Sequence, residues 1–410
     1  MRRVVVTGFG IISSIGNGVR EVTEALRDGR SGLQTVSELA AAGFRSSVYA
    51  PIRELDTARV RKRARQTMSA AALQAVLAAE EAIGIAGLET ADLQDDRCGV
   101  LIGAALGGVG EVFGCELAIQ EQHAPSRAGA NGLLRMMSST ASANVANYWG
   151  VRGRTISVAS SSATGADNIG HAFELVRWGL QDVVLCGGTE EDCWKQVGAY
   201  MENSGAVARG SDQRPSAACR PYERDRSGTV LSSGAGVLVL EDLERARRRG
   251  AGIIAEVVGY GSANEAVPGL FRLSAACVER AAREALAQAT ALHVAGVDYV
   301  NGHATGTRLG DEIEVQALRR VFGSDAPLLS STKGQTGHGM SAAGAQEAVY
   351  SLLMLAEGFV APTMNLENVA PECDGVPHVR EVLERRLDAV MSLSSGLGGN
   401  ASSLIFARPV

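Results

Sequence analysis

Residues 155–174 read TISVASSSATGADNIGHAFE, a β-branched run that passes through small polar residues into a helical pattern. Residues 155–158 predict a strand. Residues 162–178 predict a helix, because apolar side chains recur at spacings of three and four along one face, at Ile169, Ala172, Phe173 and Val176. A strand, a Gly/Ser-rich turn and a helix in this order are typical of an α/β protein.

The same order recurs in the second half of the chain. Residues 297–300 and 328–331 predict strands, residues 311–321 a helix, and residues 341–355 a helix that again opens with small residues. Further strands are predicted at 4–7, 99–102, 183–186, 236–240 and 253–260, and a charged helix at 241–249. Such apolar strands favour a buried, largely parallel sheet. The recurrence indicates an internal duplication, and the polar stretch 208–228 predicts a surface loop.

Composition narrows the class of protein. With 410 residues, 46% hydrophobic and 20% charged, the chain is typical of a soluble globular protein of two domains or one duplicated unit. A net charge of −6 argues against a nucleic-acid-binding surface over the whole molecule. No apolar stretch approaches the roughly 18 to 20 residues that span a membrane. The seven cysteines are scattered without a C-x-x-C pair, which indicates neither disulfides nor a metal site and favours a cytoplasmic location.

Two histidines and a lysine follow predicted strands. The string NGHATGTRLGDEIE places His303 after one strand, and SSTKGQTGHGMSAAGAQEA places Lys333 and His338 after another. A single histidine in a Gly-rich turn is more often a packing residue. The paired contexts instead favour one cleft, in which two neutral imidazole N–H groups could stabilise an enolate oxygen. A lysine paired with a carboxylate could orient them, and Glu314 is a candidate partner.

A serine run lies in the first half, between the strand at 155–158 and the following helix. Backbone N–H groups and the helix dipole at such a turn favour a developing negative charge near Ser160, Ser161 and Ser162. The alternative interpretation is a serine that only caps the helix.

These motifs together resemble the β-ketoacyl-acyl carrier protein synthases, and more narrowly the type I condensing enzymes of bacterial fatty acid synthesis. The resemblance runs nearly end to end, through VVVTGFGIISSIGNG, SVASSSATGADNIGHA, RPYERDRSGTVLSSGAGVLVLEDLERARRRGA, the two histidine strings and MSLSSGLGGNAS. It implies the duplicated five-layer α/β/α/β/α thiolase fold, with one half at 1–250 and the other at 251–410, and a homodimer. It also implies a substrate carried on the phosphopantetheine of an acyl carrier protein, with no other cofactor and no metal.

The resemblance further implies roles for single residues. In the family a cysteine at the start of a buried helix accepts the acyl chain, two histidines assist malonyl decarboxylation, and a lysine acts with a glutamate. His303, His338, Lys333 and Glu314 fall on the last four positions, but Ser162 stands where the cysteine belongs. An alkanol has a far higher pKa than a thiol, so Ser162 is a poor acyl acceptor. The decarboxylating groups remain.

We therefore predict that malonyl-carrier is converted to acetyl-carrier and carbon dioxide. Cysteine-to-serine homologues of this kind resemble the stand-alone decarboxylases of polyketide β-branching, where a hydroxymethylglutaryl (HMG) synthase-like partner uses the acetyl-carrier. Thr305 and Thr307 resemble pantetheine-contacting threonines. Ser395 and Leu397 stand where the family has phenylalanines that gate the acyl pocket, which puts long-chain gating in doubt.

A basic run is expected to meet the acidic carrier protein. Arg61, Lys62, Arg63 and Arg65 fall where related synthases present basic residues to their carriers, and Arg127 and Arg135 are weaker candidates. The alternative is a merely solvated helix face.

Three other functions stay open on the sequence. The chain could be a condensing synthase with an engineered cysteine-to-serine change at Ser162, or a non-catalytic subunit similar to a chain-length factor. Alternatively, Ser162 could be activated by His303 or His338 and form an acyl ester, as in an acyltransferase or hydrolase.

Overall fold

The computed structural model describes residues 1–121, 123–266 and 273–409. Ten strands form two sets of five. The first set contains β1 (Val4–Ser13), β5 (Cys98–Gly103), β6 (Thr155–Ile156), β7 (Val183–Glu190) and β8 (Gly234–Asp242). The second contains β9 (Ala255–Asn264), β10 (Tyr299–Asn301), β11 (Leu328–Ser330), β14 (Ala389–Gly396) and β15 (Asn400–Ala407).

The two sets repeat one topology. Their spatial orders are β1-β8-β7-β5-β6 and β9-β15-β14-β10-β11, so both run first, fifth, fourth, second, third along the chain. In each set the last two pairs are parallel and the first two antiparallel. The antiparallel pairing of β1 with β9 joins the sets. This repetition is the expected duplication of a βα layer.

The expectation of a largely parallel sheet is wrong for the centre of the molecule. Strands β9, β1, β8 and β7 follow one another there in antiparallel pairs, and so do β14, β15 and β9. A strand buried on both faces is apolar throughout in either direction, so its composition does not reveal how it pairs.

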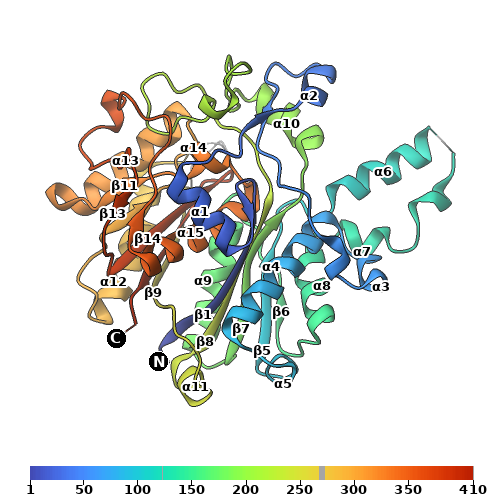
Figure 1. Cartoon of the computed structure of the whole chain (residues 1–410), viewed down its shortest axis with the longest axis horizontal. Coiled ribbons are helices and arrows are strands. Elements are labelled where there is room, and N and C mark those ends of the chain that lie inside the picture. The colour runs from blue at the N-terminus through green and yellow to red at the C-terminus, as the bar shows by residue number, and fades with distance from the viewer. Residues whose placement is uncertain (122, 267–272, 410) are drawn as a thin grey trace.

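Helices form three further layers. α9 (Thr164–Arg177) and α15 (Ala343–Glu357) follow the equivalent strands β6 and β11, and each contacts strands of both sets. On the outer faces lie α4 (Ala70–Ala86) and α8 (Thr140–Trp149) beside the first set, and α12 (Ala275–Ala291) and α13 (Arg308–Phe322) beside the second (Figure 1). The layers therefore alternate α/β/α/β/α, as predicted.

Small residues allow the two central helices to cross closely. A Cβ added at Gly165 would lie 2.5 Å from the backbone nitrogen of Ala345, closer than atoms can approach. The small residues in the first turns of α9 and α15 therefore allow the two helices to touch. This contact places the N-termini of the two helices side by side.

The remaining α-helices and β-strands surround these layers or join them. They are α1 (Val19–Asp28), α2 (Ser37–Ala41), α3 (Lys62–Arg65), α5 (Thr90–Leu93), α6 (Val109–Gln120), α7 (Gly132–Met136), α10 (Trp194–Asn203), α11 (Leu243–Arg248), α14 (Lys333–Thr336), β2 (Gly16–Asn17), β3 (Gln34–Thr35), β4 (Val48–Tyr49), β12 (Phe359–Val360) and β13 (Leu383–Glu384). α6 projects from the body of the molecule (Figure 1). Within the described ranges, no helix has both the length and the apolar character needed to cross a membrane.

Two local predictions need correction. β6 ends at Ile156 rather than 158, because the Asn168 side chain takes the backbone N–H and C=O of Val158. The stretch 208–228 is loop-like, as predicted, but it is not confined to the surface. Tyr222 and Arg226 are fully buried. The charge of Arg226 is tolerated inside the protein because its guanidinium pairs with the carboxylates of Asp311 and Glu372.

Candidate active site

Ser162 occupies the turn between β6 and α9. The backbone N–H groups of Ala163 and Thr164 bond back to Ser160 and Ser161, and Ser161 has a φ of 56°, unusual for a residue with a side chain. Asp167, in the first turn of α9, accepts hydrogen bonds from the hydroxyls of Ser160, Ser402 and Tyr260. These contacts fix the turn, and the Ser162 side chain is buried against His338.

Two imidazoles meet beside this hydroxyl. Nε2 of His338 lies 2.9 Å from Oγ of Ser162. The rings of His303 and His338 are almost perpendicular, at 87°, with centroids 5.3 Å apart. His338 follows α14 and is held through its backbone N–H by the carbonyl of Val230, at 2.7 Å. The structure thus brings the three predicted side chains together in one place.

The surroundings of the rings decide which nitrogens donate. Nζ of Lys333 lies 3.4 Å from Nδ1 of His303, and an ammonium group can only donate, so Nδ1 accepts and Nε2 carries the hydrogen. Nδ1 of His338 has no partner among the described residues. If the hydrogen is on Nε2, the unpaired atom Nδ1 is an acceptor. If it were on Nδ1, the ring would bury an unpaired N–H, which is more costly, so the Nε2–H tautomer is favoured.

Burial keeps both rings neutral. Burial, and then the charge of Lys333, lowers the pKa of His338 to about 3 and holds the pKa of His303 well below its usual value. Near pH 7 both imidazoles are therefore neutral hydrogen-bond donors through Nε2, the property that the enolate chemistry requires.

Glu314, the candidate partner of Lys333, does not form the ion pair with it. Lys333 forms its ion pair with Glu347 of α15, and both side chains are buried. Glu314 is occupied elsewhere, because its carboxylate accepts from the backbone N–H groups of His303 and Ala304, at 2.6 and 3.2 Å, and from the Tyr222 hydroxyl, at 2.6 Å. Glu314 thus holds the main chain that carries His303, while Glu347 holds the lysine.

A cavity of about 180 Å³ opens onto these groups. Its wall includes Ser162, His303 and His338 together with four residues singled out from the sequence, Thr305, Thr307, Ser395 and Leu397. The hydroxyls of Thr305 and Thr307 lie 3.1 Å apart, and the Leu397 side chain is half exposed. Apolar parts of the wall come from Met201, Leu273 and Met340. The cavity can hold a small acyl group beside the two imidazoles.

Comparison with known proteins is decisive at the level of the family. The model described as the N-terminal domain of β-ketoacyl synthases matches residues 1–246, and the model of their C-terminal domain matches residues 254–367. The chain belongs to the β-ketoacyl synthase family. Its layered structure is the thiolase-like fold of ketosynthases.

Relatives of this β-ketoacyl synthase match along the whole chain. The 3-oxoacyl-[acyl-carrier-protein] synthase 1 of Haemophilus influenzae is 40% identical, covering 100% of this chain and 99% of the relative, and that of Escherichia coli K12 is 38% identical with the same coverage. A solved β-ketoacyl synthase from Burkholderia phymatum STM815 has a TM-score of 0.94 at 32% identity, with both chains fully covered. A type II polyketide ketosynthase in complex with its acyl carrier protein has a TM-score of 0.90 at 28% identity, again with full coverage.

The basic residues of this family member lie on the surface. Arg61, Lys62 and Arg63 are exposed at α3, and Arg65 is half-buried. The Arg61 guanidinium stacks on the Tyr148 ring at 4.8 Å. Arg135 of α7 pairs with Glu111 at 2.7 Å, which offsets its charge locally. Arg127 is exposed.

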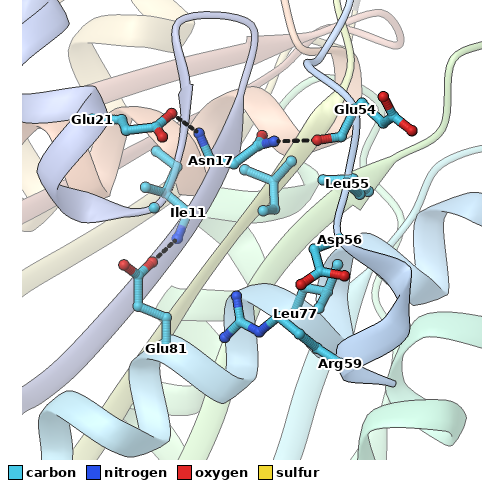
Figure 2. Close-up of a pocket in the computed structure, with 11 residues that line it drawn as sticks. Ile11, Asn17, Glu21, Glu54, Leu55, Asp56, Arg59, Leu77 and Glu81 are labelled. Carbon is cyan, nitrogen blue, oxygen red and sulfur yellow. Dashed lines mark hydrogen bonds between the residues drawn. The ribbon is translucent and has the colours of Figure 1, made fainter. Parts of the chain in front are cut away.

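A larger cavity of this ketosynthase, about 350 Å³, contains none of the predicted site residues (Figure 2). Several polar side chains around it hold the main chain. Glu81 accepts from the backbone N–H groups of Ile11 and Val19, and Asn17 donates to the carbonyl of Glu54. The Glu81 carboxylate therefore has a structural role in these contacts.

Sequence reasoning missed Glu347, Tyr222 and Thr229. Glu347 is the lone charged residue within AGAQEAVYSLLMLA, and a charge in a buried apolar helix is a signal that could have found it. Tyr222 and Thr229 lie in a motif that was recognised, RPYERDRSGTV, but nothing in that string shows that one faces Glu314 and the other the cavity.

Proposed function

We propose that this protein removes carbon dioxide from a malonyl group carried on the phosphopantetheine of an acyl carrier protein, and releases acetyl-carrier. The observation that carries the proposal is the meeting of a hydroxyl with two neutral imidazoles: Oγ of Ser162 lies against Nε2 of His338, and the ring of His303 stands beside it. By resemblance, the hydroxyl replaces the thiol that condensing enzymes acylate.

The proposed reaction uses the imidazoles as donors. The bond between the malonyl methylene carbon and its carboxylate breaks, its electron pair forms a carbon–carbon double bond, and negative charge moves to the thioester oxygen. The Nε2–H groups of His303 and His338 stabilise that oxygen. Carbon dioxide leaves, and the enolate takes up a proton from solvent at carbon to give the acetyl thioester.

Ser162 is poorly placed to act as a nucleophile. Nε2 of His338 donates in the proposed arrangement and cannot also take the hydroxyl proton. No carboxylate among the described residues bonds Nδ1 of His338, which a Ser-His-Asp type of base requires. The short contact between Ser162 and His338 therefore supports an enolate site more than an acyl-serine.

The lysine and its glutamate have a separate proposed role. Lys333 keeps Nδ1 of His303 an acceptor, and Glu347 holds Lys333 in place from α15. These two residues would position His303 without contacting the malonyl group.

The carrier and the second subunit are also part of the proposal. The relatives named above act on carrier-bound substrates by name, and one solved neighbour is a complex with its carrier protein. We assign carrier docking to Arg61, Lys62, Arg63 and Arg65. A homodimer is supported by the exposed apolar side chains Phe113 and Leu117 of α6 and Leu133 and Leu134 of α7. An HMG synthase-like partner would then use the acetyl-carrier in polyketide β-branching.

A condensing function is the second candidate. It is favoured by relatives at 38 to 40% identity over the whole chain that are named 3-oxoacyl-[acyl-carrier-protein] synthase 1. On this alternative, serine at position 162 is a change from a natural cysteine. A non-catalytic subunit has less support, because it has no use for two imidazoles aimed at one cavity.

Mass spectrometry of malonyl-carrier distinguishes these functions. The protein as it stands should convert malonyl-carrier to acetyl-carrier without an acyl donor, and should form no β-ketoacyl product when a donor carrier is added. Ser162→Cys should still decarboxylate. Vigorous elongation by Ser162→Cys would favour the condensing enzyme, and absence of acetyl-carrier with the unchanged protein would refute the proposal.

A further inference from the structure

Thr229 is part of the active-site cavity wall and has a hydroxyl without a partner among the described residues. Its side chain is 1% exposed, and its Oγ1 has no hydrogen-bond partner among the described residues. Other buried hydroxyls lack partners too, but Thr229 is the one of them that lines this cavity. A buried hydroxyl without a partner costs free energy. A bound molecule that accepts a hydrogen bond from it removes this cost, and binding is stabilised accordingly.

The main chain at Thr229 lies close to the segments that carry the reacting groups. Its neighbour Gly228 packs against the loop of His303, since a Cβ added at Gly306 would lie 2.7 Å from the Gly228 carbonyl oxygen. Its other neighbour, Val230, accepts the backbone N–H of His338 at 2.7 Å. Thr229 therefore lies between the segments that carry the two imidazoles.

The carboxylate of the malonyl group is a strong hydrogen-bond acceptor, and none of the residues discussed so far is assigned to it as a donor. The thioester oxygen has the two imidazoles, and Thr305 and Thr307 are assigned to the pantetheine. The carboxylate has no counterpart, and the cavity wall contains no arginine or lysine among the described residues. Lys333 is directed at His303 and Glu347 instead.

We propose that the Thr229 hydroxyl binds the carboxylate of the malonyl group and so selects carboxylated over plain acyl substrates. This inference rests on the proposed decarboxylase function and assigns a recognition residue to it. A neutral donor suits the reaction, because a cation would hold the carboxylate charge firmly and oppose its loss as carbon dioxide. The hydroxyl orients the carboxylate with a single weaker bond.

Binding of unreactive carriers tests the inference without turnover. Two carriers are prepared whose pantetheine ends in an amide in place of the thioester, one bearing a malonyl group and the other an acetyl group. Calorimetry measures both affinities for the full-length protein. Thr229→Val, which keeps the shape and removes the hydroxyl, should weaken binding of the malonyl carrier at least about tenfold and leave the acetyl carrier unchanged. Thr229→Ser should restore most of the difference.

A matched control removes another unpartnered hydroxyl. Ser351 is fully buried in α15, its Oγ has no partner among the described residues, and it lies outside the cavity wall. Ser351→Ala should leave both affinities unchanged. Should Thr229→Val not fold, Thr229→Ala serves in its place.

Two outcomes overturn the inference: an unchanged affinity of the Thr229→Val protein for the malonyl carrier, or an equal loss for both carriers. An equal loss would assign Thr229 to the pantetheine or to the acyl carbonyl. Failure of the proposed function is seen separately, as absence of carbon dioxide from the unchanged protein and true malonyl-carrier.

Discussion

Removing either imidazole should reduce decarboxylation by a large and similar factor. The rings are almost perpendicular, their centroids are 5.3 Å apart and both are part of one cavity wall, so we expect both Nε2–H groups to reach a single oxygen. A single preorganised donor to a developing oxyanion contributes about 2.7 to 4 kcal/mol, which corresponds to about a hundredfold to a thousandfold in rate. We therefore expect the rate constant of decarboxylation for His303→Ala and for His338→Ala to fall by at least about a hundredfold.

The double variant makes the prediction sharper. Because both donors act on the same atom, the loss in the His303→Ala/His338→Ala protein should be smaller than the product of the single losses. His303→Gln, which keeps an N–H near the position of Nε2, should recover part of the rate. The assay follows acetyl-carrier by mass spectrometry under single-turnover conditions. This separates the chemical step from binding.

A surface histidine supplies the control. The His171 side chain is half exposed, bonds Glu174 at 3.0 Å and is not part of the cavity wall, so His171→Ala should retain most of the activity. Folding of the variants is checked by thermal unfolding, since the backbone of His303 is held by Glu314 whatever its side chain. A well-folded His303→Ala protein that decarboxylates within about threefold of the unchanged protein would refute the reasoning.

Three further predictions concern the groups around the imidazoles. Burial raises the pKa of Glu347 to about 7, so the folded protein binds more protons than the unfolded chain between about pH 4.5 and 7. The free energy of unfolding should therefore fall as pH rises through that window. Urea titrations of Glu347→Gln at several pH values should lack this part of the pH dependence. Tyr222→Phe deletes a buried donor to Glu314 and should lower the free energy of unfolding by about 1 to 3 kcal/mol in the same assay, whereas no change would mean that water replaces the hydroxyl. Charge reversal at Arg61 and Arg63 should raise KM for malonyl-carrier and spare a small malonyl thioester; an equal loss on both would contradict the docking role.

The sequence predicted those parts of the site that depend on local strings. His303 follows β10 and Lys333 follows β11, while His338 comes after the short helix α14, and all three lie in recognisable Gly-containing strings. Ser162 follows β6, the strand equivalent to β11 in the other half. Because the two halves repeat one topology, turns at equivalent places meet at the helices between the sheets. Local pattern and duplication were therefore sufficient to bring these residues together.

Contacts between distant segments could not be predicted in the same way. Glu314 and Glu347 are both near Lys333 in sequence terms, and only the packing of α13 and α15 decides that Glu314 bonds the His303 backbone while Glu347 takes the lysine. The sequence likewise predicts a surface position for Arg226, because the sequence does not show that the buried carboxylate of Asp311 pairs with it. The antiparallel pairing at the centre of the sheet could not be predicted, because strands that are apolar on both faces have the same composition whichever way they pair.

The energetics of the buried charges argue for chemistry at this site. Lys333 and Glu347 are almost fully buried, and burial raises the pKa values of both Glu314 and Glu347, which means that the protein pays to keep their charged forms. A well-packed apolar set in place of a buried ion pair is often as stable or more so. A subunit that served only as scaffold would therefore gain nothing from this arrangement. Its evident effect is on the tautomer of His303, because Lys333 makes Nδ1 an acceptor and leaves the hydrogen on Nε2, as the proposed decarboxylation requires.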